Sequence, residues 1–140
     1  MCHLNEPVKR RPKDGTLRYK VVDVYDRLTN TYRSPCDFPN RIAFQVGATL
    51  VADRTRETIQ HSEIGYHGLH VCRSKTAARK LHGCFYQCFP PSGAILVVRC
   101  YGFIAAGKAD KCANNPKYNI DGIDVHETWE RCEIIEEVEI

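Results

Sequence analysis

Apolar and polar residues follow each other along the chain in patterns that predict several strands. Residues 17–25 are rich in β-branched and aromatic side chains, which is typical of a strand. Residues 41–51 resume a strand-like pattern, in which Gly47 indicates a bulge or a close approach of another backbone. The residues between these strands, 26–40, contain many turn formers and predict a hairpin tip or a loop.

The stretch 66–81 contains the clearest combination of a strand with a helix. Residues 69–72 alternate in the manner of a half-buried strand. Ser74 follows at a position where a helix N-cap accepts backbone amides. Beyond it, apolar side chains recur at three- and four-residue spacing, which predicts a helix with one face packed on a sheet. These side chains are Ala77, Leu81, Cys84 and Cys88.

Two more strands are predicted in the C-terminal half. Residues 94–104 form the most apolar run and indicate a central strand covered on both faces. After a loop over 107–124, residues 132–140 predict a closing strand. We expect Ile134, Val138 and Ile140 on one face of it, and Glu133, Glu137 and Glu139 on the other. The order of elements predicts an α+β fold, a mostly antiparallel sheet with one central helix packed on it.

Length and composition fit one domain. The chain has 140 residues, 43% of them hydrophobic and 26% charged, with a net charge of +3. We expect a flexible basic N-terminal tail over residues 1–16 and a single α+β domain over residues 17–140. The basic cluster at residues 9–13 is short and contains a proline, so we expect a solvated tail and no specific nucleic-acid binding. No apolar run is long enough to span a membrane, and the first residues lack the apolar core of a signal peptide, which predicts an intracellular, cytoplasmic protein.

The eight cysteines allow three interpretations: disulfides, a zinc site or reduced buried thiols. Four of them fall at predicted core positions, where a thiol acts as a small apolar group. A zinc site would use His82, Cys84 and Cys88 with His67, His70 or Cys112. Because no Cys-x2-Cys pair exists, we expect reduced thiols and no zinc.

The segment 68–77 resembles ADP-ribosyltransferase-fold enzymes. Its residues, Gly-Leu-His-Val-Cys-Arg-Ser-Lys-Thr-Ala, are similar to that family's Gly-Leu-Tyr-Phe-Ala, a short turn and then Ser-Lys-Ser-Ala. The apolar strand over 95–102 ends near a glycine as in the family. Residues 132–135 resemble its closing strand, which carries a catalytic glutamate in an Asn-Glu-Tyr-Ile-Val context. The Gly-Leu-His-Val-Cys element also resembles small uncharacterised proteins of phages and large DNA viruses.

The resemblance implies an ADP-ribosyltransferase-like fold, NAD as a cofactor and a set of site residues. Glu133 and His70 would be catalytic. The nucleotide would be bound by Arg18, His67, Gly68, His70 and Ser74. Two positions depart from the family, because the neighbours of Arg18 do not match and His70 replaces the tyrosine that stacks on nicotinamide. Imidazole is a smaller, titrating ring. These departures predict a scaffold whose transferase chemistry is weakened or lost.

Three function classes follow from the sequence. The first is a viral or phage-type protein that binds an NAD-like nucleotide or related small molecule, with or without transferase activity. The second is a non-enzymatic structural protein or virion component, or an interaction protein that binds a host factor. The third is a zinc-stabilised binding module. Convergence of His67, His70, Arg18 and Glu133 in one cleft would favour the first class.

Overall fold

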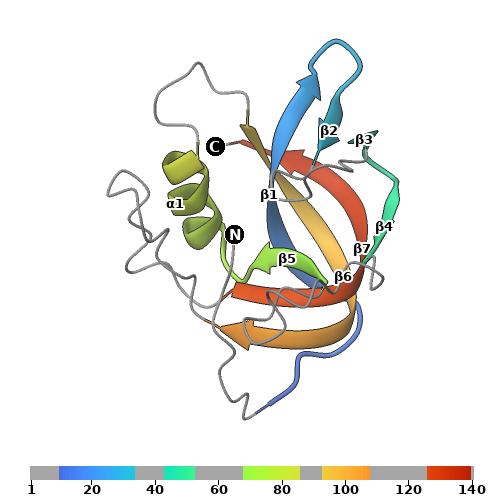
Figure 1. The fold of residues 1–140 in the computed structure, drawn as a ribbon, viewed down its shortest axis with the longest axis vertical. Coiled ribbons are helices and arrows are strands. Elements are labelled where there is room, and N and C mark those ends of the chain that lie inside the picture. The colour runs from blue at the N-terminus through green and yellow to red at the C-terminus, as the bar shows by residue number, and fades with distance from the viewer. Residues whose placement is uncertain (1–9, 34–42, 53–67, 86–92, 108–125, 140) are drawn as a thin grey trace, which may run out of the picture.

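The computed structural model describes residues 10–33, 43–52, 68–85, 93–107 and 126–139. Figure 1 shows a strongly curved sheet with one helix beside it. The described strand pairings are all antiparallel. The elements are β1 (Thr16–Asp26), β2 (Thr31–Arg33), β3 (Ala43–Phe44), β4 (Thr49–Val51), β5 (Leu69–Cys72), α1 (Lys75–Phe85), β6 (Gly93–Gly107) and β7 (His126–Val138).

Strand β6 is the centre of the sheet. It pairs with β1 on one side, from Thr16↔Cys100 to Asp23↔Gly93, and with β7 on the other. Both edges of its backbone are therefore hydrogen-bonded, and most of its first half is buried. This confirms the prediction of a central strand covered on both faces.

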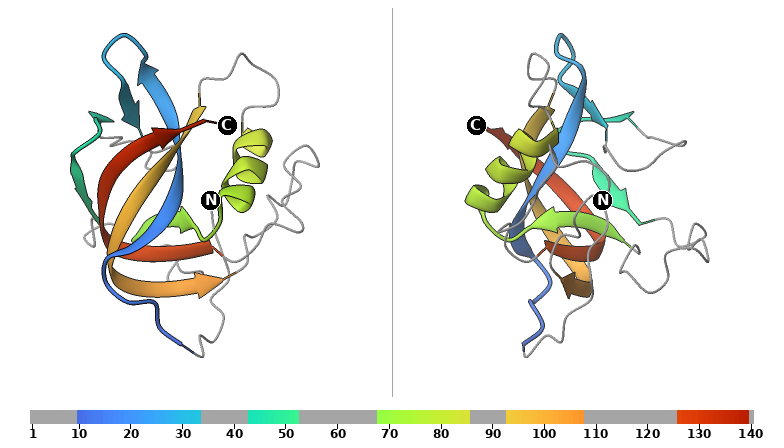
Figure 2. Two further views of the ribbon diagram at one scale, coloured as in Figure 1. Left: turned by 180° about the vertical axis from the view of Figure 1, so that it is seen from behind. Right: turned by 60° about the vertical axis from the view of Figure 1, so that its left-hand side comes forward.

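The sheet closes on itself through the short strand β5. One edge of β5 pairs with β7, from Leu69↔Trp129 to Cys72↔His126. Its other edge meets β1 at Tyr19↔Cys72. Strands β1, β6, β7 and β5 therefore form a closed ring, from which β2 and β3 extend beside β1 and β4 extends beside β7. Figure 2 shows this curvature from two further sides.

Two apolar clusters cover the two faces of the ring. The interior cluster contains thirteen buried side chains, among them Leu96, Val98, Phe103, Trp129, Cys132 and Ile134. On the outside, Ala77, Ala78 and Leu81 of α1 pack against Val21, Cys72 and Ile95. The predicted N-cap is confirmed, because the Ala77 amide donates to Ser74 Oγ at 3.0 Å. The side chain of Cys84 and all of Cys88 lie outside the described residues.

The two long strands change direction at a corner. In β7, Glu130 and Arg131 are both exposed between buried Trp129 and Cys132, so the alternation of faces is interrupted there. In β6, Gly102 adopts φ 70° and donates its N–H to Asp14 Oδ1 at 2.9 Å. A Cβ at this position would lie 2.8 Å from Glu130 Oε2, so the corner requires glycine.

The predicted α+β, ADP-ribosyltransferase-like fold is wrong. The described chain is mostly antiparallel strand, and α1, with 11 residues, covers only part of one face. Three features of the chain account for the difference. Segment 26–40, predicted as a hairpin tip or a loop, contains the tip of the β1–β2 hairpin and also the added strand β2. The predicted strand 41–51 is divided into β3 and β4 around Gly47, and β7 begins at His126 instead of residue 132.

The prediction that Ile134, Val138 and Ile140 share a face is wrong for Ile134 and Val138, and Ile140 lies outside the described residues. The pairing of β6 with β7 shifts between Val97↔Glu136 and Val98↔Ile134, which leaves Ile135 as an extra residue. Such a bulge reverses the faces of the residues beyond it. Ile134 therefore points into the ring interior, whereas Val138 packs against the cluster beneath α1.

Candidate functional site

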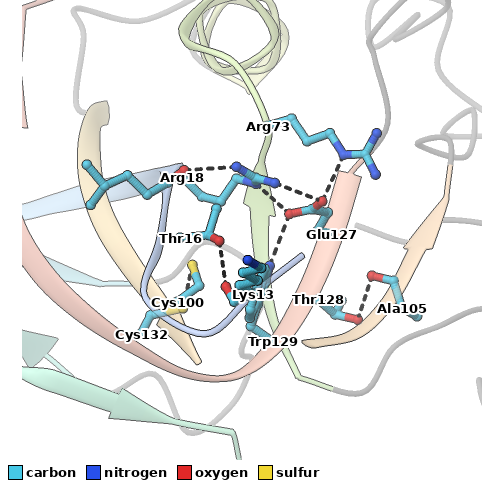
Figure 3. A network of polar contacts seen from close by, with 11 residues as sticks. Lys13, Thr16, Arg18, Arg73, Cys100, Ala105, Glu127, Thr128, Trp129 and Cys132 are labelled. Atoms are coloured by element: carbon cyan, nitrogen blue, oxygen red, sulfur yellow. Dashed lines mark hydrogen bonds and ion pairs between the residues drawn. The ribbon is translucent and has the colours of Figure 1, made fainter. Parts of the chain in front are cut away.

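A buried carboxylate binds two arginines at one end of the ring. Figure 3 shows Glu127 between Arg18 and Arg73. Arg18 Nε donates to Glu127 Oε1 at 2.6 Å, and Arg18 Nη2 donates to Oε2 at 3.4 Å. Arg73 Nε donates to Oε2 at 2.8 Å, and Trp129 Nε1 donates to Oε1 at 3.1 Å. Both carboxylate oxygens of this fully buried residue are thus hydrogen-bonded.

Three separate elements bring these residues together. Arg18 lies in β1 opposite Val98, on the face that points into the ring. Arg73 directly follows β5. Glu127 lies opposite Val71 in the pairing of β5 with β7, and Trp129 shares its face two residues later. The site therefore exists only when the ring is closed.

The arginines keep Glu127 ionised. Burial, the largest single influence, raises the pKa of its carboxyl group, but the hydrogen bonds from Arg18, Arg73 and Trp129 and the charge of Arg18 together outweigh burial and leave that pKa lowered. A low pKa and four donated hydrogen bonds make Glu127 a poor proton acceptor. Its chemical role is to position the two guanidinium groups.

The site has surplus positive charge. Two guanidinium groups and one carboxylate leave one net positive charge, and the side chains of Arg18 and Arg73 are 17% and 41% exposed. Arg73 uses Nε for Glu127, and within the described chain its two terminal nitrogens have no hydrogen bond. The next residue, Ser74, caps α1, whose first turn contains no acidic residue. The partial positive charge of that helix end adds to the charge of Arg73.

Two of the predicted binding residues lie at this cluster. Arg18 is part of it, and Ser74 directly follows Arg73. Gly68 lies just before β5 with φ 93°, and a Cβ there would be 2.6 Å from Ile104 Cδ1, which indicates a packing role. His67 lies outside the described residues.

The structure does not bring His70 and Glu133 together. His70 pairs with Thr128 in the ladder of β5 with β7, and its carbonyl oxygen accepts a hydrogen bond from Lys20 Nζ at 3.0 Å. Glu133 lies five residues beyond Thr128 on β7, roughly 17 Å along the strand, and pairs with Arg99. The two residues are therefore on different sections of the ring, and their joint catalytic role stays a prediction.

The central residues of the site were not predicted from sequence. Glu127 and Trp129 precede the predicted closing strand. Arg73 belongs to the segment 68–77, but the resemblance of that segment to ADP-ribosyltransferases implies no role for it. One signal was present, since the single tryptophan of the chain lies among charged residues. A buried indole requires a hydrogen-bond acceptor, and a carboxylate two residues away on the same strand face can supply it.

The described residues offer no group of three or more histidine, cysteine or acidic side chains that could hold a metal ion. Of the zinc ligands considered, Cys88, Cys112, His67 and the side chain of Cys84 lie outside the description. No helix in the described part of the chain is long and apolar enough to cross a membrane.

Comparisons of the chain with protein-family models, with curated protein sequences and with solved structures found no match. The resemblance to ADP-ribosyltransferases and to phage and large-DNA-virus proteins therefore stays a prediction from the sequence.

Proposed function

We propose that this protein binds a nucleotide, of which NAD is one example, through its phosphate groups where Arg73 and the N-terminus of α1 adjoin. The supporting observation is that Arg18 and Arg73 share the carboxylate of Glu127, so that among the described residues these three groups carry one net positive charge, beside a partly exposed guanidinium. Phosphate groups are the natural counterions for such a site.

Several hydrogen-bond donors near Arg73 could bind a phosphate. The Nε bond to Glu127 holds the Arg73 guanidinium in place and leaves its terminal nitrogens for a ligand. Amides at the start of α1 provide further donors, because the first turn of a helix leaves its N–H groups without intrahelical partners. Ser74 Oγ accepts the Ala77 amide and can still donate its own hydrogen.

The proposal concerns binding and includes no reaction step. Glu127 is occupied by four hydrogen bonds, and Glu133 lies on a distant section of β7. Any transferase activity would need a second catalytic group near Arg73.

A protein-interaction role is the second candidate. The C-terminal end of strand β1 and the turn after it expose two large apolar side chains, Leu28 at 97% and Tyr25 at 58%. The Tyr25 ring is already covered on one side by the Arg33 guanidinium, 3.6 Å from the ring centroid. Isolated exposed apolar residues are common on protein surfaces, so this observation supports the interaction role less strongly than the charge of the arginine site supports nucleotide binding.

Thermal unfolding with NAD, ADP and inorganic phosphate tests the proposal. A nucleotide at about 100 times its dissociation constant should stabilise the protein by about 2.7 kcal/mol. The Arg73→Gln variant should lose this shift. Arg79→Gln removes the same charge from an exposed position of α1 and should keep it. Absence of any shift in the unmodified protein, or an equal loss in both variants, would refute nucleotide binding at Arg73.

A further inference from the structure

Two cysteine side chains face each other inside the ring. Cys100 of β6 and Cys132 of β7 are paired in register, and their Sγ atoms are 3.6 Å apart. Both residues are fully buried and belong to the interior apolar cluster. The proposed nucleotide site makes no use of either thiol.

The backbone geometry at this pair is compatible with a disulfide. Ile134 bonds to the residues just before β4, because its N–H donates to Ala48 O and its C=O accepts from Gly47 N. Cys132, two residues earlier, has the same backbone orientation and also pairs with β4, at Leu50. The Cys100↔Cys132 pair is therefore a non-hydrogen-bonded pair of the β6–β7 ladder, in which Cα atoms lie about 4.5 Å apart. That separation is within the range found in disulfides.

Basic side chains lie on the same inner face as the thiols. Arg18 pairs with Val98 and Lys20 pairs with Leu96, so both share the face of Cys100. The hydrogen bond from Cys100, followed by the charge of Lys20, lowers the pKa of the Cys132 thiol despite its burial. The same hydrogen bond and burial raise the pKa of Cys100. The positive charge of Lys20 on this inner face favours the anionic form of Cys132, so Cys132 is assigned as the nucleophile of the pair.

We propose that Cys100 and Cys132 form an oxidisable pair, which a hydroperoxide converts into a cross-strand disulfide between β6 and β7. The Cys132 thiolate attacks one oxygen of hydrogen peroxide, the O–O bond breaks, and the sulfur becomes a sulfenic acid as hydroxide leaves. Cys100 sulfur then attacks the sulfenic sulfur, the S–S bond forms, and the S–OH bond breaks. The two thiol protons end in water, so two thiols and one peroxide give one disulfide and two waters.

The disulfide would restrict movement of β6 and β7 at the bend of the ring. The sulfurs must approach by about 1.5 Å to reach disulfide length. The bridge would lie next to the bend at Gly102 and close a chain segment whose ends are 32 residues apart. A cross-link of that span restricts the unfolded chain, so the oxidised protein should unfold at a temperature higher by roughly 10 °C.

Oxidation of the folded protein with hydrogen peroxide, followed by alkylation and peptide mapping, tests the proposal. The expected product is a cross-linked peptide containing Cys100 and Cys132, accompanied by the rise in unfolding temperature. The Cys100→Ala variant should show neither change. Cys72→Ala is the matched control, because Cys72 is also buried but lies in the cluster beneath α1, and it should still form the bridge.

Peptide mapping of the unmodified protein tests the Cys100–Cys132 disulfide even if the Cys100→Ala variant does not fold. Peroxide-treated protein in which Cys100 and Cys132 remain alkylated as free thiols, or in which either is joined to a different cysteine, would overturn the proposal. Conversion of Cys132 to a sulfinic acid without a bridge would overturn it as well.

Discussion

Arg18 Nε lies 2.6 Å from Glu127 Oε1, although the two residues are 109 positions apart in the chain. Arg18 belongs to β1 and Glu127 to β7, and these strands do not pair with each other among the described residues. Strands β5 and β6 each pair with both β1 and β7 and so lie between them in the ring. The ion pair therefore connects two strands that share no backbone hydrogen bonds among the described residues.

Replacing Glu127 with Gln should destabilise the protein by about 2 to 4 kcal/mol, because two guanidinium groups lose their counterion. This loss of stability is smaller than for a fully buried ion pair, because Arg73 is 41% exposed and water can solvate its charge. Urea unfolding followed by the fluorescence of the single tryptophan, Trp129, measures the change. A loss below about 0.5 kcal/mol would show that the buried carboxylate contributes little to stability.

The same variant should show a weaker dependence of stability on pH. The pKa of Glu127 is lowered in the folded protein, so its charge stabilises the fold above the unfolded value of 4.5. That contribution is lost as pH falls from 4.5 through the folded pKa. The difference in unfolding free energy between the unmodified protein and Glu127→Gln should therefore have its largest value at pH 7 and decrease as the pH falls below 4.5. A difference that stays constant into acid would contradict the lowered pKa.

Arg18 should contribute more to stability than Arg73. Arg18 makes two hydrogen bonds to Glu127 from a side chain only 17% exposed, whereas Arg73 makes one from a side chain 41% exposed. Surface ion pairs contribute about 0 to 1 kcal/mol, and less exposed, doubly bonded pairs contribute more. Double-mutant cycles with Glu127→Gln should give a larger coupling energy for Arg18→Gln than for Arg73→Gln. The reverse order would contradict the geometry.

Gly68 and Gly47 allow a matched test of steric packing. Both have φ near 92°, so alanine strains the backbone by a similar amount at each. At Gly68 the new Cβ would lie 2.6 Å from Ile104 Cδ1 and 2.9 Å from Trp129 O, whereas at Gly47 nothing lies within 4 Å. Gly68→Ala should therefore cost about 1 to 3 kcal/mol more than Gly47→Ala in chemical unfolding. Equal losses would mean that the contact at Gly68 relaxes freely.

The buried face of α1 provides a further test. Leu81 is 4% exposed and packs under the helix, so Leu81→Ala should cost about 2 to 5 kcal/mol. Arg79 is exposed on the other side of the same helix, and Arg79→Ala should change stability by less than about 0.5 kcal/mol. Thermal unfolding compares the two variants, and similar losses would mean that the helix is oriented differently.

Sequence patterns correctly predicted the elements that are specified by apolar runs and capping residues within a short stretch of chain. The strand over 69–72 coincides with β5, the strand over 94–104 lies within β6, and Ser74 caps α1 as predicted. Apolar runs and capping residues act locally, so a single sequence can reveal them. Closure of the ring depends on β5 meeting both β1 and β7, and nothing in the local pattern of residues 69–72 specifies those partners.

The cluster of Glu127 with Arg18 and Arg73 could not be predicted from the sequence for a related reason. Residues 126–128, His-Glu-Thr, are polar and lie between the predicted loop 107–124 and the predicted strand 132–140, so the sequence predicts no element for them. In the structure all three are buried strand residues, and the charge of Glu127 can be buried because Arg18 and Arg73, distant in sequence, neutralise it. A charge that is stabilised by tertiary contacts cannot be distinguished from a solvated charge by its neighbours in the chain.

Closure of the ring also governs when the protein can fold during its synthesis. β1 pairs with β6 between residues 70 positions apart, at Asp23↔Gly93, and 84 positions apart, at Thr16↔Cys100. A ribosome adding about 5 to 20 residues per second needs roughly 4 to 17 s to produce that partner. Until then β1 can form only its hairpin with β2, and the apolar side chains of Val21 and Val22 have no strand to cover them. The apolar side chains of β1 must therefore avoid aggregation until β6 has been synthesised, and the ring can close only after β7 has followed.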